Sequence, residues 1–228
     1  MKKVISFSLW GAGLSFHVGA IENAKLAQHF FPDFECWFYV HKDSVHYDII
    51  NDLILMKNVK VILKTGDLTK IKPMMWRFES IDHPLVEINL SRDTDTRILL
   101  REKLAVEQWL LSDKLFHIMR DHPDHNFVIL GGMFGTRKIP TIPSWQNVMQ
   151  GIRQIGTRDY DQNFLKTFIY PIIKKNSFVH ATFHKFELHA VDFPIPYDQE
   201  YKFVGEYVYF DESRSQPHTD HLINQIKK

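Results

Sequence analysis

One stretch decides the fold: Asp82-His83-Pro84-Leu85-Val86-Glu87-Ile88-Asn89-Leu90-Ser91-Arg92-Asp93-Thr94-Asp95-Thr96-Arg97. Its apolar part, residues 86–90, contains β-branched side chains and predicts a buried strand. Residues 99–111 have the three-to-four spacing of a helix. The group of charges between them therefore falls at a strand-to-helix turn. In open α/β sheets, ligands bind at the edge where such strands end.

The charges in this turn suit a metal-bridged diphosphate. Asp93 and Asp95 are one residue apart, so their carboxylates can converge on a hard divalent cation, which prefers oxygen ligands. Arg92 and Arg97 flank them and could grip phosphate oxygens in a bidentate manner. Asp-Thr-Asp-Thr is also typical of a turn and a helix N-cap, so a purely structural role stays open.

The rest of the N-terminal half predicts an α/β fold. Strands are expected at residues 4–9, 35–40 and 59–63, and helices at 15–31 and 44–56. This alternation predicts a mostly parallel, doubly wound sheet with helices on both faces. Gly11-x-Gly13 follows the first strand, but Phe16 replaces the third glycine of the dinucleotide fingerprint, so a Rossmann site is excluded.

Composition limits the class of protein. The chain has 228 residues, 44% apolar content and a net charge of +1, which argues for one globular domain and against a dedicated nucleic-acid binder. We expect this domain over residues 1–212, with a polar and mobile tail at 213–228. The single cysteine, Cys36, fits a reducing compartment, and no apolar run could span a bilayer. We therefore expect a cytoplasmic protein.

Further candidate side chains flank this turn in the sequence. Pro73 starts a short helix over residues 72–82, which either delivers Arg77 to the pocket or leaves it on the surface. A strand at 116–119 ends in a cluster of acids and histidines, which with Asp93 and Asp95 could build a mixed nitrogen and oxygen metal site. That cluster comprises Asp121, His122, Asp124 and His125.

The second half of the chain carries weaker signals. Gly131, Gly132 and Gly135 leave room for close approach to the backbone, but the Gly-Lys-Ser/Thr ending of a phosphate loop is absent. Helices are expected at 145–155 and 160–173, and short strands or an extended wrap at 177–212. On the helix at 99–111, Arg101, Glu102, Lys103 and Glu107 should lie mostly on the solvated face.

Several ordered motifs resemble a GT-A-type glycosyltransferase family found in bacteria and large DNA viruses. The likeness covers residues 4–212 and is densest from 72 to 135. Its motifs are Ser8-Leu9-Trp10-Gly11, Trp76-Arg77-Phe78, Ser91-Arg92-Asp93-Thr94-Asp95-Thr96-Arg97, Arg101-Glu102-Lys103, Phe116-His117-Ile118-Met119-Arg120-Asp121-His122-Pro123 and Leu130-Gly131-Gly132-Met133-Phe134-Gly135. The resemblance implies a nucleotide-diphosphate-sugar transferase with a DxD motif, Mn²⁺ (or Mg²⁺), and most often a UDP-sugar donor.

The resemblance also implies roles for single residues. Asp95 resembles the direct metal ligand, and Asp93 the residue that shares metal and ribose contacts. Ser8 and Trp10 resemble the nucleoside-binding edge. The other carried-over donor contacts are Arg77 and the sugar-pocket loop at Gly131 and Gly132.

One departure concerns the third metal ligand. Where the family has His-Asp-Ser, this chain has Lys175-Asn176-Ser177. His180, His184 or water would then complete the site, or Lys175 would contact phosphate directly.

The sequence leaves the mechanism open. An inverting enzyme would need a base for the acceptor hydroxyl, with Asp121, His122 and Asp124 as candidates, whereas a retaining enzyme could use the leaving diphosphate. The acceptor would be a glycan or another hydroxyl compound. The alternative functions are a metal-dependent hydrolase and a noncatalytic sugar-binding protein. The hydrolase would use Asp93, Asp95, His122 and His125.

Overall fold

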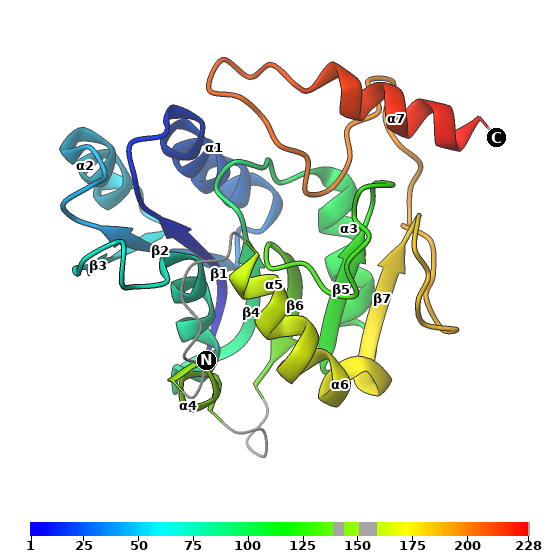
Figure 1. The fold of residues 1–228 in the computed structure, drawn as a ribbon, viewed down its shortest axis with the longest axis horizontal. Coiled ribbons are helices and arrows are strands. Elements are labelled where there is room, and N and C mark those ends of the chain that lie inside the picture. The colour runs from blue at the N-terminus through cyan, green and yellow to red at the C-terminus, as the bar shows by residue number, and fades with distance from the viewer. Residues whose placement is uncertain (139–143, 151–158, 228) are drawn as a thin grey trace.

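Seven strands form one sheet in the computed structural model, which describes residues 1–138, 144–150 and 159–227 (Figure 1). Their order is β3-β2-β1-β4-β6-β5-β7, and β6 runs antiparallel to both of its neighbours while the other pairs are parallel. The strands are β1 (Lys2–Leu9), β2 (Phe34–His41), β3 (Val59–Lys64), β4 (Val86–Arg92), β5 (Phe116–Arg120), β6 (Met133–Arg137) and β7 (Ser177–Ala181). The predicted mostly parallel α/β sheet is confirmed.

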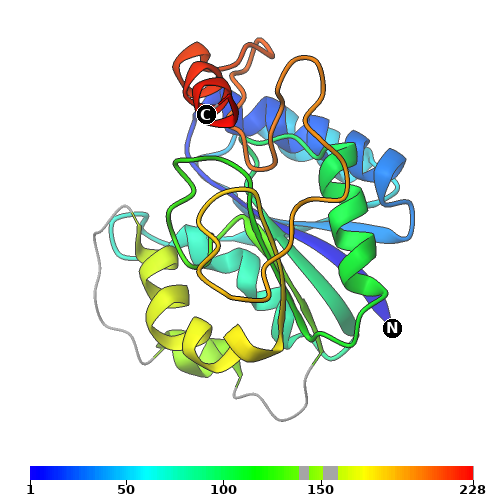
Figure 2. The same cartoon turned by 90° about the vertical axis from the view of Figure 1, so that its right-hand side faces the viewer.

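Helices cover both faces of this sheet, as Figure 2 shows. One face carries α1 (Leu14–Phe30), α2 (Tyr47–Leu55) and α3 (Leu100–Leu110). The other carries the 3₁₀ helix η1 (Pro73–Asp82), α4 (Trp145–Gln150), α5 (Tyr160–Phe164), the π-helical turn η2 (Leu165–Ile169) and α6 (Tyr170–Ile173), followed by the 3₁₀ turn η3 (Lys174–Asn176). Within the described residues, no helix is long and apolar enough to cross a bilayer.

Strand β1 shows why the sheet needs two helical layers. Ile5, Phe7 and Leu9 are fully buried in the core beneath α1, α2 and α3. Val4 points to the opposite face, where it packs with Trp37 and Trp76. Because side chains alternate across a strand, a central strand that is buried on both faces must be covered on both.

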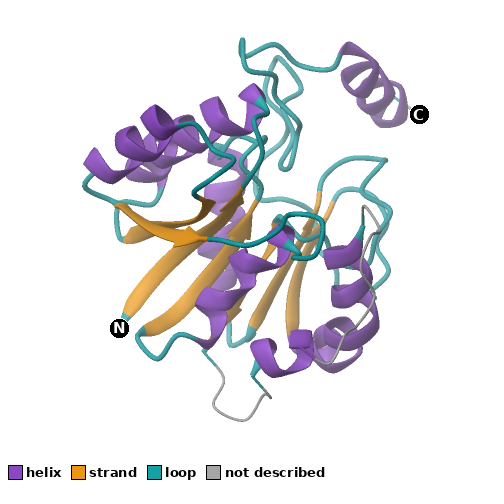
Figure 3. Ribbon diagram, turned by 60° about the vertical axis from the view of Figure 1, so that its left-hand side comes forward, coloured by secondary structure: helices purple, strands orange, loops and turns teal. Residues whose placement is uncertain are grey.

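The chain end differs from the sequence expectation. Residues 182–215 form long loops, and residues Gln216–Ile226 form a helix, α7, that lies beyond the carboxyl ends of β5 and β7 (Figures 1 and 3). Pro217 occupies the first turn of this helix, where its missing N–H costs nothing, and Leu222 is buried. The boundary at residue 212 stays a prediction, as does the mobility of the tail.

Two buried charged side chains correct the expectation that the charges of α3 lie mostly on its solvated face. Arg101 and Glu102 were expected mainly on the solvated face, but they are 7% and 2% exposed. Each is ion-paired with a partner from another segment, Arg101 with Asp121 and Glu102 with Arg92. Buried charges persist when they are paired in this way. The predicted helix at 145–155 is described only over α4, and residues 151–155 lie outside the described part.

Candidate active site

A cavity of about 550 Å³ opens where β1 and β4 end. Strands β1 and β4 are neighbours in the sheet. From β1 the strand order continues to β2 and β3, and from β4 it continues in the opposite direction to β6. Such a switch point is where open α/β sheets bind ligands. Of the sequence-predicted residues, the cavity is lined by Ser8, Trp10, Arg77, Asp93, Asp95, His125, Gly131 and Gly132.

Arg77 is the central cation of this cavity. It is 5% exposed, and its guanidinium is ion-paired with both Asp93 and Asp161. The backbone N–H of Arg77 donates to Ser8 Oγ over 2.9 Å, so β1 fixes the position of η1. The alternative of a surface arginine is wrong. The Arg77 side chain joins helix α5 to the turn that carries Asp93 and Asp95, the DxD turn.

Asp161 is a site residue that sequence reasoning missed. Burial raises the pKa of its carboxyl, and the adjacent Arg77 opposes that rise. Its chain segment shows no motif, so the one available signal was its position at the start of a predicted helix. Its partnership with Arg77 depends on the tertiary fold.

Neighbouring side chains explain why Gly131 and Gly132, in the turn before β6, carry no side chain. A Cβ at Gly132 would overlap the Asp93 carboxylate, and one at Gly131 would overlap Asp161 and Arg77. These two glycines therefore let the acidic side chains lie directly on the backbone. The close approach expected from the sequence involves residues of the protein itself.

The electrostatics of the DxD turn suit a cation. Burial raises the pKa of Asp95 to about 7, the charge of Asp93 adds to the rise, and Arg77 and Arg97 oppose it. The Asp93 side chain is 42% exposed toward the cavity. The carboxylates of Asp93 and Asp95 are also oxygen donors of the kind that Mn²⁺ and Mg²⁺ prefer. The residues present therefore fit the metal that the family resemblance implies.

Buried Asn23 of α1 holds the DxD turn in place. Its Nδ2 donates to Thr96 O over 2.7 Å and to Thr94 O over 3.3 Å, and its Oδ1 accepts from Ile98 N over 3.0 Å. The side chain is completely buried. Because these three bonds satisfy backbone groups of a loop, Asn23 is a positioning residue that the sequence did not reveal.

Three predicted phosphate-binding residues lie outside the cavity. Arg92 is buried with Nε 2.5 Å from Glu102 Oε1, and its Nη1 donates to the carbonyl of Phe134. Arg97 forms a bidentate pair with Glu212. Lys175 precedes β7, which runs parallel to β5, so it lies at the amino ends of these strands, opposite the DxD turn.

Asp121 is a structural anchor. Its carboxylate is fully buried and accepts from Arg101 Nε and Nη2 over 2.9 and 2.8 Å. It also accepts from Thr182 Oγ1, the Tyr197 hydroxyl and Val204 N. These bonds tie the C-terminal loops to the end of β5 and leave no free lone pair facing the cavity.

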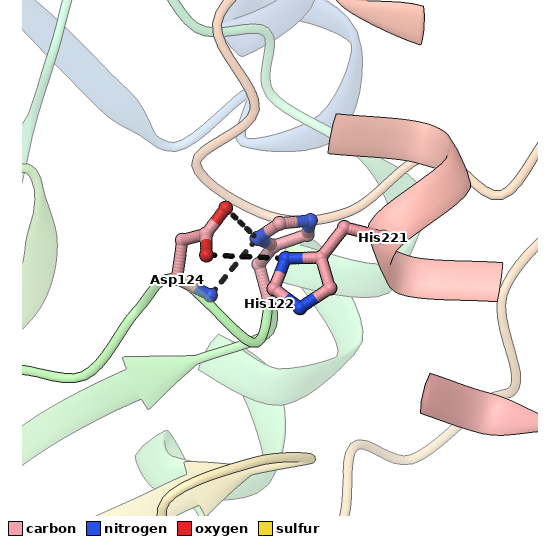
Figure 4. Close-up of side chains that lie close together, drawn as sticks. All are labelled: His122, Asp124 and His221. Atoms are coloured by element: carbon pink, nitrogen blue, oxygen red, sulfur yellow. Dashed lines mark hydrogen bonds and ion pairs between the residues drawn. The ribbon is translucent and has the colours of Figure 1, made fainter. Parts of the chain in front are cut away.

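The neighbouring candidates point toward α7. His122 is 1% exposed and stacks on Phe203, with ring centroids 4.3 Å apart. Asp124 lies between His122 and His221, and neither His122 nor Asp124 lines the cavity (Figure 4). The structure therefore does not bring Asp93, Asp95, His122 and His125 together as one metal site.

The proposed third ligands also lie elsewhere. His180 bonds to His117 and to Gln108 inside the sheet layer, and His184 contacts the Pro123 carbonyl. Neither histidine lines the cavity.

Comparisons with known proteins concern the fold. No family model matches the sequence, and no curated protein matches it. An active-site mutant of LgtC has 13% identity and a TM-score of 0.50, over 89% of this chain and 92% of that chain. A glycosyltransferase involved in the glycosylation of the major capsid of PBCV-1 has 15% identity and a TM-score of 0.48, over 78% and 81%. A 4-diphosphocytidyl-2C-methyl-D-erythritol synthase from Anaerococcus prevotii has 11% identity and a TM-score of 0.48, over 100% and 99%.

The fold is thus GT-A-like, a single α/β domain built on a seven-stranded, mostly parallel sheet. At 13% identity the likeness to the LgtC mutant extends to the architecture alone. Any activity must therefore be inferred from the side chains of the cavity.

Proposed function

We propose that the chain transfers a sugar from a nucleotide-diphosphate donor, a UDP-sugar in the first instance, to a hydroxyl group of a glycan or another acceptor. The single observation that carries the proposal is the Asp93 and Asp95 pair beside Arg77, in a cavity of about 550 Å³ at the switch point of the sheet. That volume lies in the range of small-molecule sites. The metal would be Mn²⁺ or Mg²⁺, held by Asp93 and Asp95.

The residues of the cavity divide the donor between them. Trp10 and Phe16 offer aromatic surface for the nucleoside, next to Ser8 at the end of β1. Arg77 orients Asp93 and places a fixed positive charge beside the diphosphate, where negative charge grows as the anomeric bond breaks. Gly131 and Gly132 line the cavity where the sugar ring, which develops oxocarbenium character, would lie. When bound, the metal would act as a Lewis acid for the departing diphosphate.

The three candidate bases are given no proton-transfer role in this proposal. The Asp121 carboxylate already accepts five hydrogen bonds from four residues, whereas His122 and Asp124 face α7. The metal-dependent hydrolase loses support because His122 lies outside the cavity that Asp93, Asp95 and His125 line. A cytoplasmic location remains a prediction.

Calorimetric titration tests the proposal. UDP, GDP and their common sugar derivatives are titrated into the protein with Mn²⁺ and then with EDTA. We expect one nucleotide to bind in a metal-dependent way, and Asp95→Asn to abolish this binding. Asp113→Asn is the matched control, because Asp113 is exposed and precedes β5 at the other edge of the sheet. Failure of every nucleotide to bind the folded protein would overturn the proposal.

A further inference from the structure

A second group of metal-ligating side chains lies outside the cavity, between the loop after β5 and helix α7. His122 and Asp124 come from that loop, and His221 comes from the helix (Figure 4). One ligand atom from each residue can be chosen so that all of them lie within 4.8 Å of one another. Among the described residues, these are the His, Cys, Asp and Glu side chains that converge in a group of three.

The distances suit a tetrahedral ion. His122 Nδ1 lies 3.4 Å from Asp124 Oδ2, and His221 Nδ1 lies 3.2 Å from Asp124 Oδ1. Zinc bonds to nitrogen and oxygen are about 2.0–2.2 Å long, so two ligand atoms on one tetrahedral ion are about 3.3–3.5 Å apart. The two histidines face different oxygens of Asp124, and because all three donors lie within 4.8 Å of one another, side-chain rotations would bring them onto one ion.

Hydrogen bonds already set the tautomer of His122 for metal binding. Its Nε2 lies 2.9 Å from the carbonyl oxygen of His218, which can only accept, so Nε2 carries the proton. Its Nδ1 carries the lone pair, which now accepts from Asp124 N over 3.1 Å, and a bound cation would replace that N–H as its partner. A ligating histidine commonly donates its other N–H to a carbonyl, which fixes the ring orientation.

We propose that His122, Asp124 and His221 bind a borderline transition-metal cation, Zn²⁺ in the first instance, which fastens α7 to the loop after β5. Two imidazoles and one carboxylate favour Zn²⁺ over Mn²⁺ or Mg²⁺, whereas the all-oxygen pair Asp93 and Asp95 has the reverse preference. The two sites thus take different metals. This inference does not depend on the proposed transferase activity.

The ion would also order the wall of the large cavity. Phe203 stacks on His122, and the segment that follows it supplies Gly205 and Tyr207 to the cavity lining. Val208 N donates to the Asp95 carbonyl over 2.8 Å. Fixing His122 against α7 therefore holds the C-terminal segment over the DxD turn.

Zinc titration of the EDTA-treated 228-residue chain, followed by calorimetry and thermal melting, tests the inference. The wild type is expected to bind one Zn²⁺ at this site with a rise in melting temperature. His221→Gln should weaken that binding at least tenfold and remove the rise. His46→Gln is the matched control, since His46 forms an exposed contact of 3.4 Å with Asp48 at the start of α2. It should behave as the wild type.

A further variant distinguishes zinc binding at this site from metal binding at the DxD turn. Asp95→Asn should retain the zinc ion. Co²⁺ bound instead of Zn²⁺ should show the visible absorption of a tetrahedral site. This absorption should be lost in His221→Gln. Absence of zinc binding would overturn the inference. So would binding that survives in His221→Gln, and so would binding that disappears in Asp95→Asn.

Discussion

Replacing Asp121 by Asn removes the charge from the carboxylate that anchors the C-terminal loops while keeping its shape. Arg101, 7% exposed, would then hold an uncompensated charge, and the Val204 N–H, Thr182 and Tyr197 bonds would have to share one remaining oxygen. Removing one partner of a buried ion pair costs about 3–5 kcal/mol. For a chain of this size that corresponds to a melting temperature lower by roughly 6–20 °C.

Urea unfolding followed by tryptophan fluorescence measures this loss. Glu107→Gln is the matched control, because it makes the same acid-to-amide change on α3 in an exposed pair with Lys103. Its expected cost is about 0.3–0.5 kcal/mol. An Asp121→Asn protein within about 1 kcal/mol of the wild type would refute the structural role of Asp121. The carboxylate would then again be a candidate base.

Three further predictions concern the DxD turn. Gly132→Ala places a methyl group against Asp93, so we expect calorimetry to show UDP affinity in Mn²⁺ lower by about tenfold, or about 1.4 kcal/mol. Asn23→Ala leaves the Thr96 carbonyl and the Ile98 N–H unpaired, so urea unfolding should show a loss of about 2–3 kcal/mol. EDTA should reduce UDP affinity in the wild type, and added Mn²⁺ should restore it.

Each of these has a contrary result. Unchanged UDP affinity in Gly132→Ala would show that the position of Asp93 is unimportant for the donor. An Asn23→Ala protein as stable as the wild type would show that the turn is held by other contacts. UDP binding that is insensitive to EDTA would show that the nucleotide binds without a metal.

The fold was largely predictable because its strands carry strong local signals. Residues 4–9 and 86–90 each place three apolar side chains on one face, and the helices between strands have clear spacing. Strand β6 was missed because Gly135 and its polar neighbours lack such a signal. This glycine is required because Trp109 and Leu90 pack against its backbone, which a linear pattern does not show.

The site was predictable where its residues fall in one stretch of sequence. The position of Asp93 and Asp95 at the cavity followed from the turn that holds them, and that of Arg77 from the helix before it, whereas their roles toward a metal and a donor stay predictions. Arg92 was misplaced because its partner, Glu102, comes from the next helix. Asp161 was missed because it meets Arg77 only after folding.

Cleavage of a nucleotide-diphosphate sugar in the cavity is the step that we propose for this chain. It is tested most directly by measuring UDP release from a panel of UDP-sugars, with Mn²⁺ and with EDTA, in the wild type and in Asp95→Asn. We expect release from one donor that requires Mn²⁺ and falls by about 100-fold, or about 2.7 kcal/mol, in Asp95→Asn. Release that is equal in the two proteins, or no release from any donor that binds, would contradict it.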